Sequence, residues 1–593
     1  MRLVVDRIEM PGFGSIPLSR RPTPHDGTSG FAVGITAGDA WGRSVLPAGA
    51  ESEHWSWWIA RDDVAAQLVR SVSLVFRVVD VAGRLRMLRH GYQSWSPSDV
   101  AVFGEDRDRS LASGSIELIR AINQADQRIV EVGDELRSEW LTILVDDTNE
   151  PVLAAFNGGD LHDGTLRLRT GETGTELWCE AFLGDLVPAE GERRDLHDVL
   201  IAHGASADAL LSGWAATVGS IGGARINADH QVGWCSWYHY FHGVTQNDIT
   251  SNLRLADDWP FDVFQVDDGY QSAIGDWLTT NQKFPDGLEA LAASIADRGR
   301  RPGLWLAPFL AAPDSRLALE HPEWLARGFD GEPLINMFNA PWEGGRDGLM
   351  YGLDTTIPEV QEHLRALAAT VVDMGFTYLK LDFTFSPSFD GVWADQSFTP
   401  AQRVRAGFDA IRAGAGDETF LLGCGVPLAN SVGVIDGNRI GADVAPAWSL
   451  PSNVLLFSGY SGTQPATRHA WAATATRSFM HRRLWLNDPD CVMLRAEQTE
   501  LSPNAARTWA QAVGVSGGMV LVSDDLSLLD NSARELLDEA IALSRHSDNA
   551  ARTGVVAAAP GLLEGAEPTV LRSAAGELVV TLADGSSKFN PIG

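Results

Sequence analysis

The chain has 593 residues, of which 78 are acidic and 46 basic, so its formal net charge is -32. An acid-rich surface repels phosphate backbones and anionic membranes, so we expect no nucleic acid and no membrane as partners. The fractions of 45% hydrophobic and 21% charged residues are those of a globular protein, and the length suggests about two to four domains. The basic residues include only three lysines, Lys283, Lys380 and Lys588.

Residues 1–210 are predicted to form an N-terminal β-sandwich domain. Short runs of alternating character recur there, such as residues 72–79 and 141–145, and Gly, Asp and Pro turns separate them. Many short strands punctuated by turns are typical of two packed antiparallel sheets.

A different pattern begins near residue 211, where apolar strand candidates start to alternate with helical stretches such as 358–374 and 399–414. The eight strand candidates are 231–237, 263–268, 302–308, 377–383, 419–424, 438–443, 484–488 and 518–523. Eight such units over 211–548 predict a catalytic (β/α)8 TIM barrel, with a doubly wound sheet as the alternative. No G-x-G-x-x-G motif follows the first strand candidate, so a dinucleotide site is not expected.

The last segment, residues 549–593, alternates again around 578–582 and predicts a small C-terminal antiparallel β domain. The fold class is therefore multidomain, with a barrel between two β domains.

The cysteines and the chain start bear on the cellular compartment. Four cysteines without a CxxC pair are too few for a disulfide scaffold and do not match a structural zinc site. The first residues lack the apolar core of a signal peptide, and no apolar run reaches the roughly 20 residues that cross a bilayer. We therefore expect a cytoplasmic protein.

Barrel enzymes place their catalytic groups at the carboxyl ends of the strands, which turns the strand candidates into a short set of residues. At those ends stand Asp267 and Asp268, Trp305, Lys380 and Asp382, Cys424 and Gly425, Arg439 and Asp443, and Asp488 and Asp490. Charged side chains are costly to bury unless they are paired or used. One such aspartate is equally well explained by structural ion pairing, for example of Lys380 with Asp382, but carboxylates on four strands together favour a functional site.

Two carboxyl groups are what a retaining glycosidase needs, one as nucleophile and one as general acid/base. Lys380 and Asp382 point to the same side of their strand because side chains alternate along it, so the ammonium can keep the nucleophile ionised. Arg439 and Asp443 are suited to substrate binding and proton transfer. The 20 tryptophans fit a protein that stacks aromatic rings on sugars, although core packing explains any single one. No metal or cofactor is needed for this chemistry.

Two further motifs are better explained by structure than by chemistry. Residues 514–518 fit G-x-S-x-G, but a helix precedes Ser516 and a strand follows it, which is the reverse of a nucleophile elbow. His239 and His242 form H-x-x-H without further ligands at matching spacing, so loop hydrogen bonding is the favoured explanation.

These residues stand in motifs that resemble glycoside hydrolase family 36, the bacterial α-galactosidases of the clan shared with family 27. The motifs run in order along the chain over residues 91–96, 234–238, 266–271, 305–309, 380–383, 423–425, 439–443 and 485–490. The segments at 380–383 and 439–443 are the specific ones, and the others add to them by their order.

The resemblance implies an N-terminal β-supersandwich and a retaining exo-acting α-galactosidase that releases terminal α-galactosyl residues from small carbohydrate substrates. It implies that Asp382 is the nucleophile and Asp443 the acid/base. It further assigns substrate contacts to Asp267, Asp268, Lys380, Arg439, Trp234, Trp305, Trp95, Phe383, Cys424 and Gly425.

One motif departs from the larger family members, in which a glycine-rich stretch follows the fifth strand. Here residues 424–428 read Cys-Gly-Val-Pro-Leu, which resembles a shorter type. The oligomeric state and the tolerance for an N-acetyl group at C2 therefore stay open. An α-N-acetylgalactosaminidase, an α-galactosyl transglycosylase and a non-catalytic sugar-binding protein are the alternatives.

Overall fold

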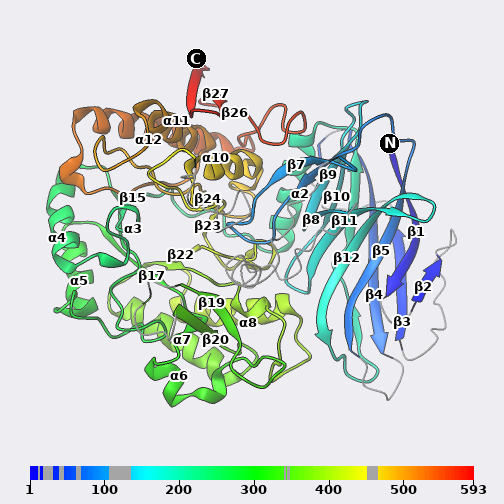
Figure 1. The fold of residues 1–593 in the computed structure, drawn as a ribbon, viewed down its shortest axis with the longest axis horizontal. Helices are drawn as coiled ribbons and strands as arrows, with labels where there is room; N and C mark the ends of the chain where they lie inside the picture. Colours follow the sequence, from blue (N-terminus) through cyan, green and yellow to red (C-terminus); the bar gives the residue numbers. More distant parts are fainter. Residues whose placement is uncertain are drawn as a thin grey trace.

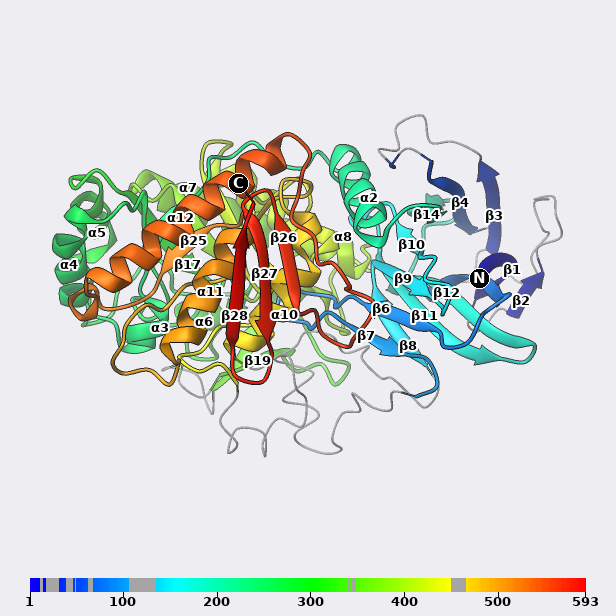
Figure 2. The same ribbon diagram turned by 90° about the horizontal axis from the view of Figure 1, so that it is seen from above.

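The computed structural model describes residues 1–10, 14–17, 31–38, 46–47, 49–61, 68–105, 135–339, 342, 348–449 and 465–592. A β-rich body made by the N-terminal part of the chain lies beside a larger α/β body, and a small sheet near the C-terminus packs on the latter (Figures 1 and 2). No helix in these ranges has the length and apolar character needed to cross a membrane.

The N-terminal body contains two antiparallel sheets, as the alternating runs predict. One has the order β2-β1-β5-β12-β11-β8, and the other has the order β13-β4-β14-β10-β9-β6-β7 with β3 paired to β4. The strands are β1 (Arg2–Met10), β2 (Gly14–Pro17), β3 (Phe31–Gly38), β4 (Glu51–Arg61), β5 (Val69–Val79), β6 (Arg86–Arg89), β7 (Asp99–Val102), β8 (Leu136–Glu139), β9 (Leu141–Val145), β10 (Val152–Phe156), β11 (Asp163–Gly171), β12 (Gly174–Leu186), β13 (Arg193–Asp195) and β14 (Val199–His203).

Helix α2 (Ala207–Ile221) joins the sandwich to the barrel and packs against both. Its Trp214 is fully buried, donates its indole N–H to Phe156 O at 3.1 Å and packs edge-on against Trp140. The apolar face of this helix therefore fixes the relative position of the two bodies.

The central sheet consists of eight short parallel strands in the order β24-β23-β22-β21-β17-β16-β15-β25. They are β15 (Val232–Cys235), β16 (Val263–Val266), β17 (Arg301–Leu306), β21 (Tyr378–Leu381), β22 (Phe420–Gly423), β23 (Gly437–Arg439), β24 (Leu486–Asp488) and β25 (Val520–Val522). The amide of Met519 donates to Asn487 O at 2.9 Å, which joins the two ends of this order. The sheet is the predicted TIM barrel, and each strand overlaps its predicted range.

Helices surround the barrel, and a small sheet is inserted after β17. The helices are α3 (Trp237–Tyr240), α4 (Gln246–Leu255), α5 (Gly287–Ala296), α6 (Arg316–Glu320), α7 (Pro358–Asp373), α8 (Pro400–Ala415), α10 (Thr467–Thr476), α11 (Pro503–Ser516) and α12 (Asn531–Arg552). The inserted strands are β18 (Leu310–Ala311), β19 (Ile335–Phe338) and β20 (Leu349–Gly352). Helices α4 and α8 start at capping boxes, in which Thr245 and Thr399 accept from the third helical amide.

The C-terminal sheet is antiparallel, with strands β26 (Val570–Ser573), β27 (Gly576–Thr581) and β28 (Ser586–Pro591) in sequence order. It packs against α11, as Figure 2 shows. In the fifth connection of the barrel, between β22 and β23, a single short 3₁₀ turn (Ala429–Ser431) stands where other units have a helix.

Candidate active site

The carboxyl ends of the barrel strands bring together most of the residues that the sequence singled out. Asp267 and Asp268 follow β16, Trp305 lies near the end of β17, and Asp382 follows β21. Arg439 ends β23, and Asp443 follows it. All six except Asp443 are buried, so their charges interact in a region of low polarity.

Asp382 is held by two hydrogen bonds. The indole N–H of Trp305 donates to its Oδ2 at 2.9 Å, and the amide of Phe383 donates to its Oδ1 at 2.8 Å. Burial raises the pKa of Asp382, while the nearby ammonium of Lys380 and the bond from Trp305 oppose that rise. The carboxyl group is thus fixed in position and has a cation close enough to favour its ionised form.

Lys380 pairs with Asp267 and not with Asp382. Its Nζ lies 2.9 Å from Asp267 Oδ2, and both side chains are buried. The amide of Gln265 and the thiol of Cys235 also donate to Asp267 Oδ2. Burial opposes the charge on Lys380, but Asp267, Cys424 and Cys235 together outweigh it and hold the pKa of the ammonium well above its usual range. The suggested structural pairing of Lys380 with Asp382 is therefore wrong.

Asp268 lies beside this pair, and no lysine or arginine in the described part of the chain forms an ion pair with it. Its Oδ2 accepts from the Trp342 indole at 2.7 Å and its Oδ1 from the Gln271 amide at 2.6 Å. Burial raises the pKa of Asp268 to about 6, and these two bonds only partly counter it. Trp342 was not predicted, because it lies in a loop to which no strand-end rule applies.

Arg439 is surrounded by carboxylates. Nη1 donates to Asp443 Oδ1 at 2.8 Å and to Asp490 Oδ2 at 2.9 Å, and Nη2 lies 2.8 Å from Asp490 Oδ1. A longer contact of 3.4 Å joins Nε to Asp488. Burial opposes the guanidinium charge, but Asp490 and the groups around it together outweigh burial and raise the pKa of Arg439. Asp443 remains the exposed partner, with 30% of its side chain accessible.

Asp490 and Tyr238 belong to this group, although the sequence assigned neither of them a role. The Tyr238 hydroxyl donates to Asp490 Oδ2, and the amide of Val444 donates to the same oxygen at 2.8 Å. Asp490 has φ +98°, a conformation that aspartate adopts more readily than most residues. Its place at the end of the seventh strand was the available signal.

An aromatic wall closes one side of the site. Trp95 comes from the sandwich and packs edge-on against Phe383 at 5.0 Å between ring centroids. Gly425 has φ +55°, and a Cβ there would lie 3.0 Å from Trp95 Cη2. The indole N–H of Trp95 has no hydrogen-bond partner among the described residues, which leaves a donor beside the site.

Cys424 lies beside the end of β21, whereas Trp234 lies away from the other predicted site residues. Cys424 is buried, its amide donates to Leu381 O at 2.8 Å, and burial raises the pKa of its thiol. Trp234 is fully buried, stacks on Phe264 at 4.3 Å and donates its indole N–H to Asp524 O. Its neighbour Cys235 is the β15 side chain that reaches Asp267. Because side chains alternate along a strand, Trp234 packs on the other face, and the structure does not bring it to the residues at the mouth of the barrel.

The motifs set aside have structural roles in the described part of the chain. Ser516 ends α11, is buried, and donates its hydroxyl to Val513 O at 2.7 Å. His239 packs edge-on against Tyr240, and no group of three or more His, Cys, Asp or Glu side chains within the described ranges has a metal-site arrangement.

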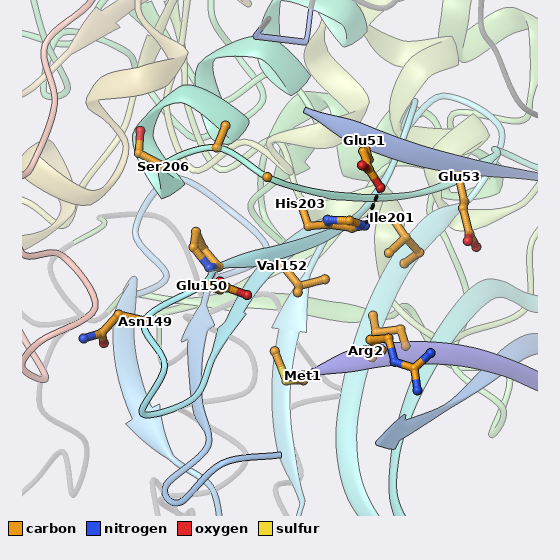
Figure 3. Close-up of a pocket in the computed structure, with 14 residues that line it drawn as sticks. Met1, Arg2, Glu51, Glu53, Asn149, Glu150, Val152, Ile201, His203 and Ser206 are labelled. Atoms are coloured by element: carbon orange, nitrogen blue, oxygen red, sulfur yellow. Dashed lines mark ion pairs between the residues drawn. The ribbon is translucent and has the colours of Figure 1, made fainter. Parts of the chain in front are cut away.

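A cavity of about 760 Å³ lies in the sandwich, between β1, β4, β10 and β14 (Figure 3). Two of the side chains that line it, Glu51 and His203 on the paired strands β4 and β14, approach each other to 3.8 Å. It contains none of the predicted site residues, so it is separate from the mouth of the barrel.

Sequence comparisons connect the barrel to known proteins. A family model described as Melibiase matches residues 228–385. The α-galactosidase AgaA of Geobacillus stearothermophilus is 25% identical over 155 residues, which are 25% of this chain and 20% of that protein. An α-galactosidase of Escherichia coli is 36% identical over 108 residues, 17% of this chain and 14% of that one. The matched segments thus span about a fifth or less of these curated relatives.

Comparison of structures extends the likeness to nearly the whole chain. The α-galactosidase TtGalA of Thermus thermophilus, in complex with p-nitrophenyl α-D-galactopyranoside, superposes with a TM-score of 0.70 and 26% identity. That match covers 95% of this chain and 99% of the other. The structure of AgaA from Geobacillus stearothermophilus shares the fold, with a TM-score of 0.59, 13% identity and coverage of 98% and 80%.

Proposed function

We propose, because the chain resembles the α-galactosidases of glycoside hydrolase family 36 in sequence and in fold, that it is a retaining exo-acting α-galactosidase. The observation that carries the proposal is the pair of carboxyl groups at the ends of β21 and β23, each held by its own donors. Asp382 is fixed by Trp305 and the Phe383 amide, and Asp443 is fixed by Arg439.

Asp382 is the nucleophile in this proposal. Its two hydrogen bonds fix the carboxylate plane, and the nearby charge of Lys380 favours the ionised form that attack on the anomeric carbon requires. Attack from Asp382 forms a covalent galactosyl-enzyme as the bond to the leaving oxygen breaks. Water then displaces the carboxylate, and the released galactose has the starting anomeric configuration.

Asp443 is the general acid/base. It donates a proton to the leaving oxygen in the first step and accepts one from the attacking water in the second. Its side chain is 30% exposed while Asp382 is buried, which suits a group that must meet both the leaving group and water. The guanidinium of Arg439 orients the carboxyl at 2.8 Å.

The remaining polar residues suit recognition of one sugar ring. Asp267 and Asp268 present carboxylate oxygens that accept hydrogen bonds from sugar hydroxyls, and Lys380 presents a donor beside them. Trp305, Phe383 and Trp95 provide the apolar surfaces that pack against sugar C–H groups, with Cys424 and Gly425 at the side of the ring.

The nucleophile is tested with Asp382→Gly and with Asp382→Asn, which keeps the shape of the side chain. In both variants kcat on p-nitrophenyl α-galactoside is expected to fall at least about a thousandfold. This corresponds to a rise of roughly 4 kcal/mol in the activation free energy. Proton NMR of the reaction of the wild-type enzyme should show α-galactose as the first product. Turnover within tenfold of wild type would overturn the assignment of Asp382, and β-galactose as first product would overturn retention.

The acid role is tested with Asp443→Ala on substrates that differ in leaving group. Protonation matters most for a poor leaving group, so the loss of kcat/KM should be much larger for a disaccharide than for the nitrophenyl galactoside. Equal losses on both substrates would contradict the role of Asp443.

A further inference from the structure

We propose that Arg477 is a positioning residue that fixes Trp95 at the mouth of the barrel by holding the backbone on both sides of that tryptophan. This inference rests on the proposed function for its activity readout only. Arg477 follows helix α10, is fully buried and lies far along the chain from the sandwich segment that it binds.

The guanidinium joins the sandwich to the barrel through four hydrogen bonds. On the sandwich side, Nη1 donates to Ser94 O at 3.0 Å and Nη2 donates to Ser96 O at 2.8 Å. On the barrel side, Nη1 donates to Ile440 O at 2.7 Å, next to Arg439. The two sandwich carbonyls flank Trp95, so the backbone at this residue is held from both sides.

The fourth hydrogen bond of the guanidinium is made to His90, a second side chain of the sandwich. Nε donates to His90 Nε2 at 3.2 Å, and the other ring nitrogen of His90 bonds to Glu139 O at 3.0 Å. His90 is therefore the neutral tautomer with its hydrogen on Nδ1. Burial and the Arg477 charge both lower the pKa of His90, which keeps it neutral.

Arg477 has no carboxylate partner among the described residues, and burial lowers its pKa to about 9. A buried charge without an opposite charge is costly, so the arginine at this position is explained by its hydrogen bonds and not by a salt bridge. The planar fork of arginine can reach three carbonyls and an imidazole at once, which a lysine ammonium cannot do.

The segment held by Arg477 also pairs with the loop after β22. Ser94 N–H donates to Val426 O at 3.1 Å, Val426 N–H donates to Ser94 Oγ at 3.1 Å, and Gln93 bridges to Pro427 in antiparallel fashion. These bonds attach the segment to the loop, while Arg477 holds the carbonyls of Ser94 and Ser96.

A direct series of contacts runs from this segment to the proposed nucleophile. The ring of Trp95 packs on Phe383, and the amide of Phe383 donates to Asp382 Oδ1. A shift of the segment carrying Trp95 would therefore move the aromatic wall beside Asp382. Arg477 acts on the site only through these intermediates.

The first test measures backbone hydrogen exchange in the full-length protein, with the variants Arg477→Lys and Arg477→Met. Arg482→Met is the matched control, because Arg482 is equally buried but bonds Asp548 and the carbonyls of Ile226 and Ala228, which precede β15. Exchange in residues 92–97 should be at least about tenfold faster in both Arg477 variants and unchanged in the control. Unchanged exchange in a folded Arg477 variant would overturn the proposal.

The second test is a double-mutant cycle on p-nitrophenyl α-galactoside. Arg477→Lys and Trp95→Ala should each lower kcat/KM about tenfold, and the double variant should lose no more than about threefold beyond Trp95→Ala alone. Losses that multiply to about a hundredfold would show that Arg477 does not act through Trp95 and would overturn the inference. If the wild type hydrolyses no α-galactoside, the proposed function fails, while the exchange experiment still decides the role of Arg477.

Discussion

The ammonium of Lys380 lies 2.9 Å from the carboxylate of Asp267, and both groups are buried. Lys380 is on β21 and Asp267 follows β16, so the ion pair spans β17, which lies between these strands in the sheet. The pair links the proposed sugar-binding carboxylates to the strand that carries Asp382. Because Lys380 is also close enough to favour the ionised form of Asp382, one cation serves two carboxylates.

Lys380→Arg is expected to lower kcat/KM about a hundredfold, or about 2.7 kcal/mol. Asp267 Oδ2 already accepts from Gln265, and a guanidinium is larger and planar, so it would not reproduce the position of the buried, compact ammonium. Steady-state kinetics on p-nitrophenyl α-galactoside checks this expectation. Lys588→Arg on the exposed strand β28 is the control and should behave as wild type. An active Lys380→Arg enzyme would refute a special need for lysine.

Asp268→Asn is expected to change how stability depends on pH. The folded protein keeps the Asp268 proton up to about pH 6, while the unfolded chain releases it near the usual value of 3.8. The folded state therefore binds more protons between these values, and the free energy of unfolding falls as pH rises through this window. Asparagine does not titrate, so the variant should gain about 3 kcal/mol relative to wild type between pH 4 and pH 7.

Urea unfolding of the wild type and of Asp268→Asn at pH 4, 5, 6 and 7 measures this difference. A constant difference between variant and wild type across the series would contradict it. The same substitution should abolish detectable hydrolysis if Asp268 binds sugar, so greater stability and lost activity are expected together. Such a result would mean that the buried carboxylate destabilises the protein without substrate and is required for substrate binding.

The barrel was predictable because its pattern is local. Apolar runs such as 231–237 and 377–383 are bounded by turn residues and followed by helical stretches. Because barrel enzymes place catalytic groups at the carboxyl ends of strands, these runs then point to Asp267, Asp382 and Asp443. The structural likeness confirms the barrel, and the sequence matches together with the Thermus thermophilus structure confirm the resemblance to α-galactosidases. The roles of the selected residues stay predictions until variants are measured.

What could not be predicted depends on contacts between distant segments. The partner of Lys380 is set by the order of the strands in the sheet, which sequence spacing does not contain. Whether Trp234 or Cys235 faces the barrel interior depends on the phase of a four-residue strand. Trp342 donates to Asp268 from a loop, and Arg477 donates to Ser94 O from the end of α10. No hydrophobic periodicity in the sequence marks either position.

Trp305→Phe and Trp234→Phe make a matched pair that separates a site role from a packing role. Trp305→Phe removes the donor to Asp382 and should lower kcat/KM about tenfold to a hundredfold, as expected for a bond to a charged group worth about 1.5–3 kcal/mol. Trp234→Phe removes the bond to Asp524 O and should lower the free energy of unfolding by about 1–3 kcal/mol with kcat/KM nearly unchanged. Kinetics and urea unfolding of both variants check this, and a large kinetic loss in Trp234→Phe would return that residue to the site.

Gly425→Ala is expected to disturb the aromatic wall directly. The residue has φ +55°, so alanine costs about 1–2 kcal/mol of backbone strain, and its Cβ would meet Trp95 Cη2 at 3.0 Å and the Phe383 amide nitrogen at 3.1 Å. The control is Gly223→Ala, because Gly223 has φ +65° but no atom within 4 Å of the added Cβ. Both variants should lose stability through backbone strain, whereas only Gly425→Ala should raise KM for p-nitrophenyl α-galactoside and shift tryptophan fluorescence. Equal kinetics in the two variants would show that crowding of Trp95 has no effect on substrate binding.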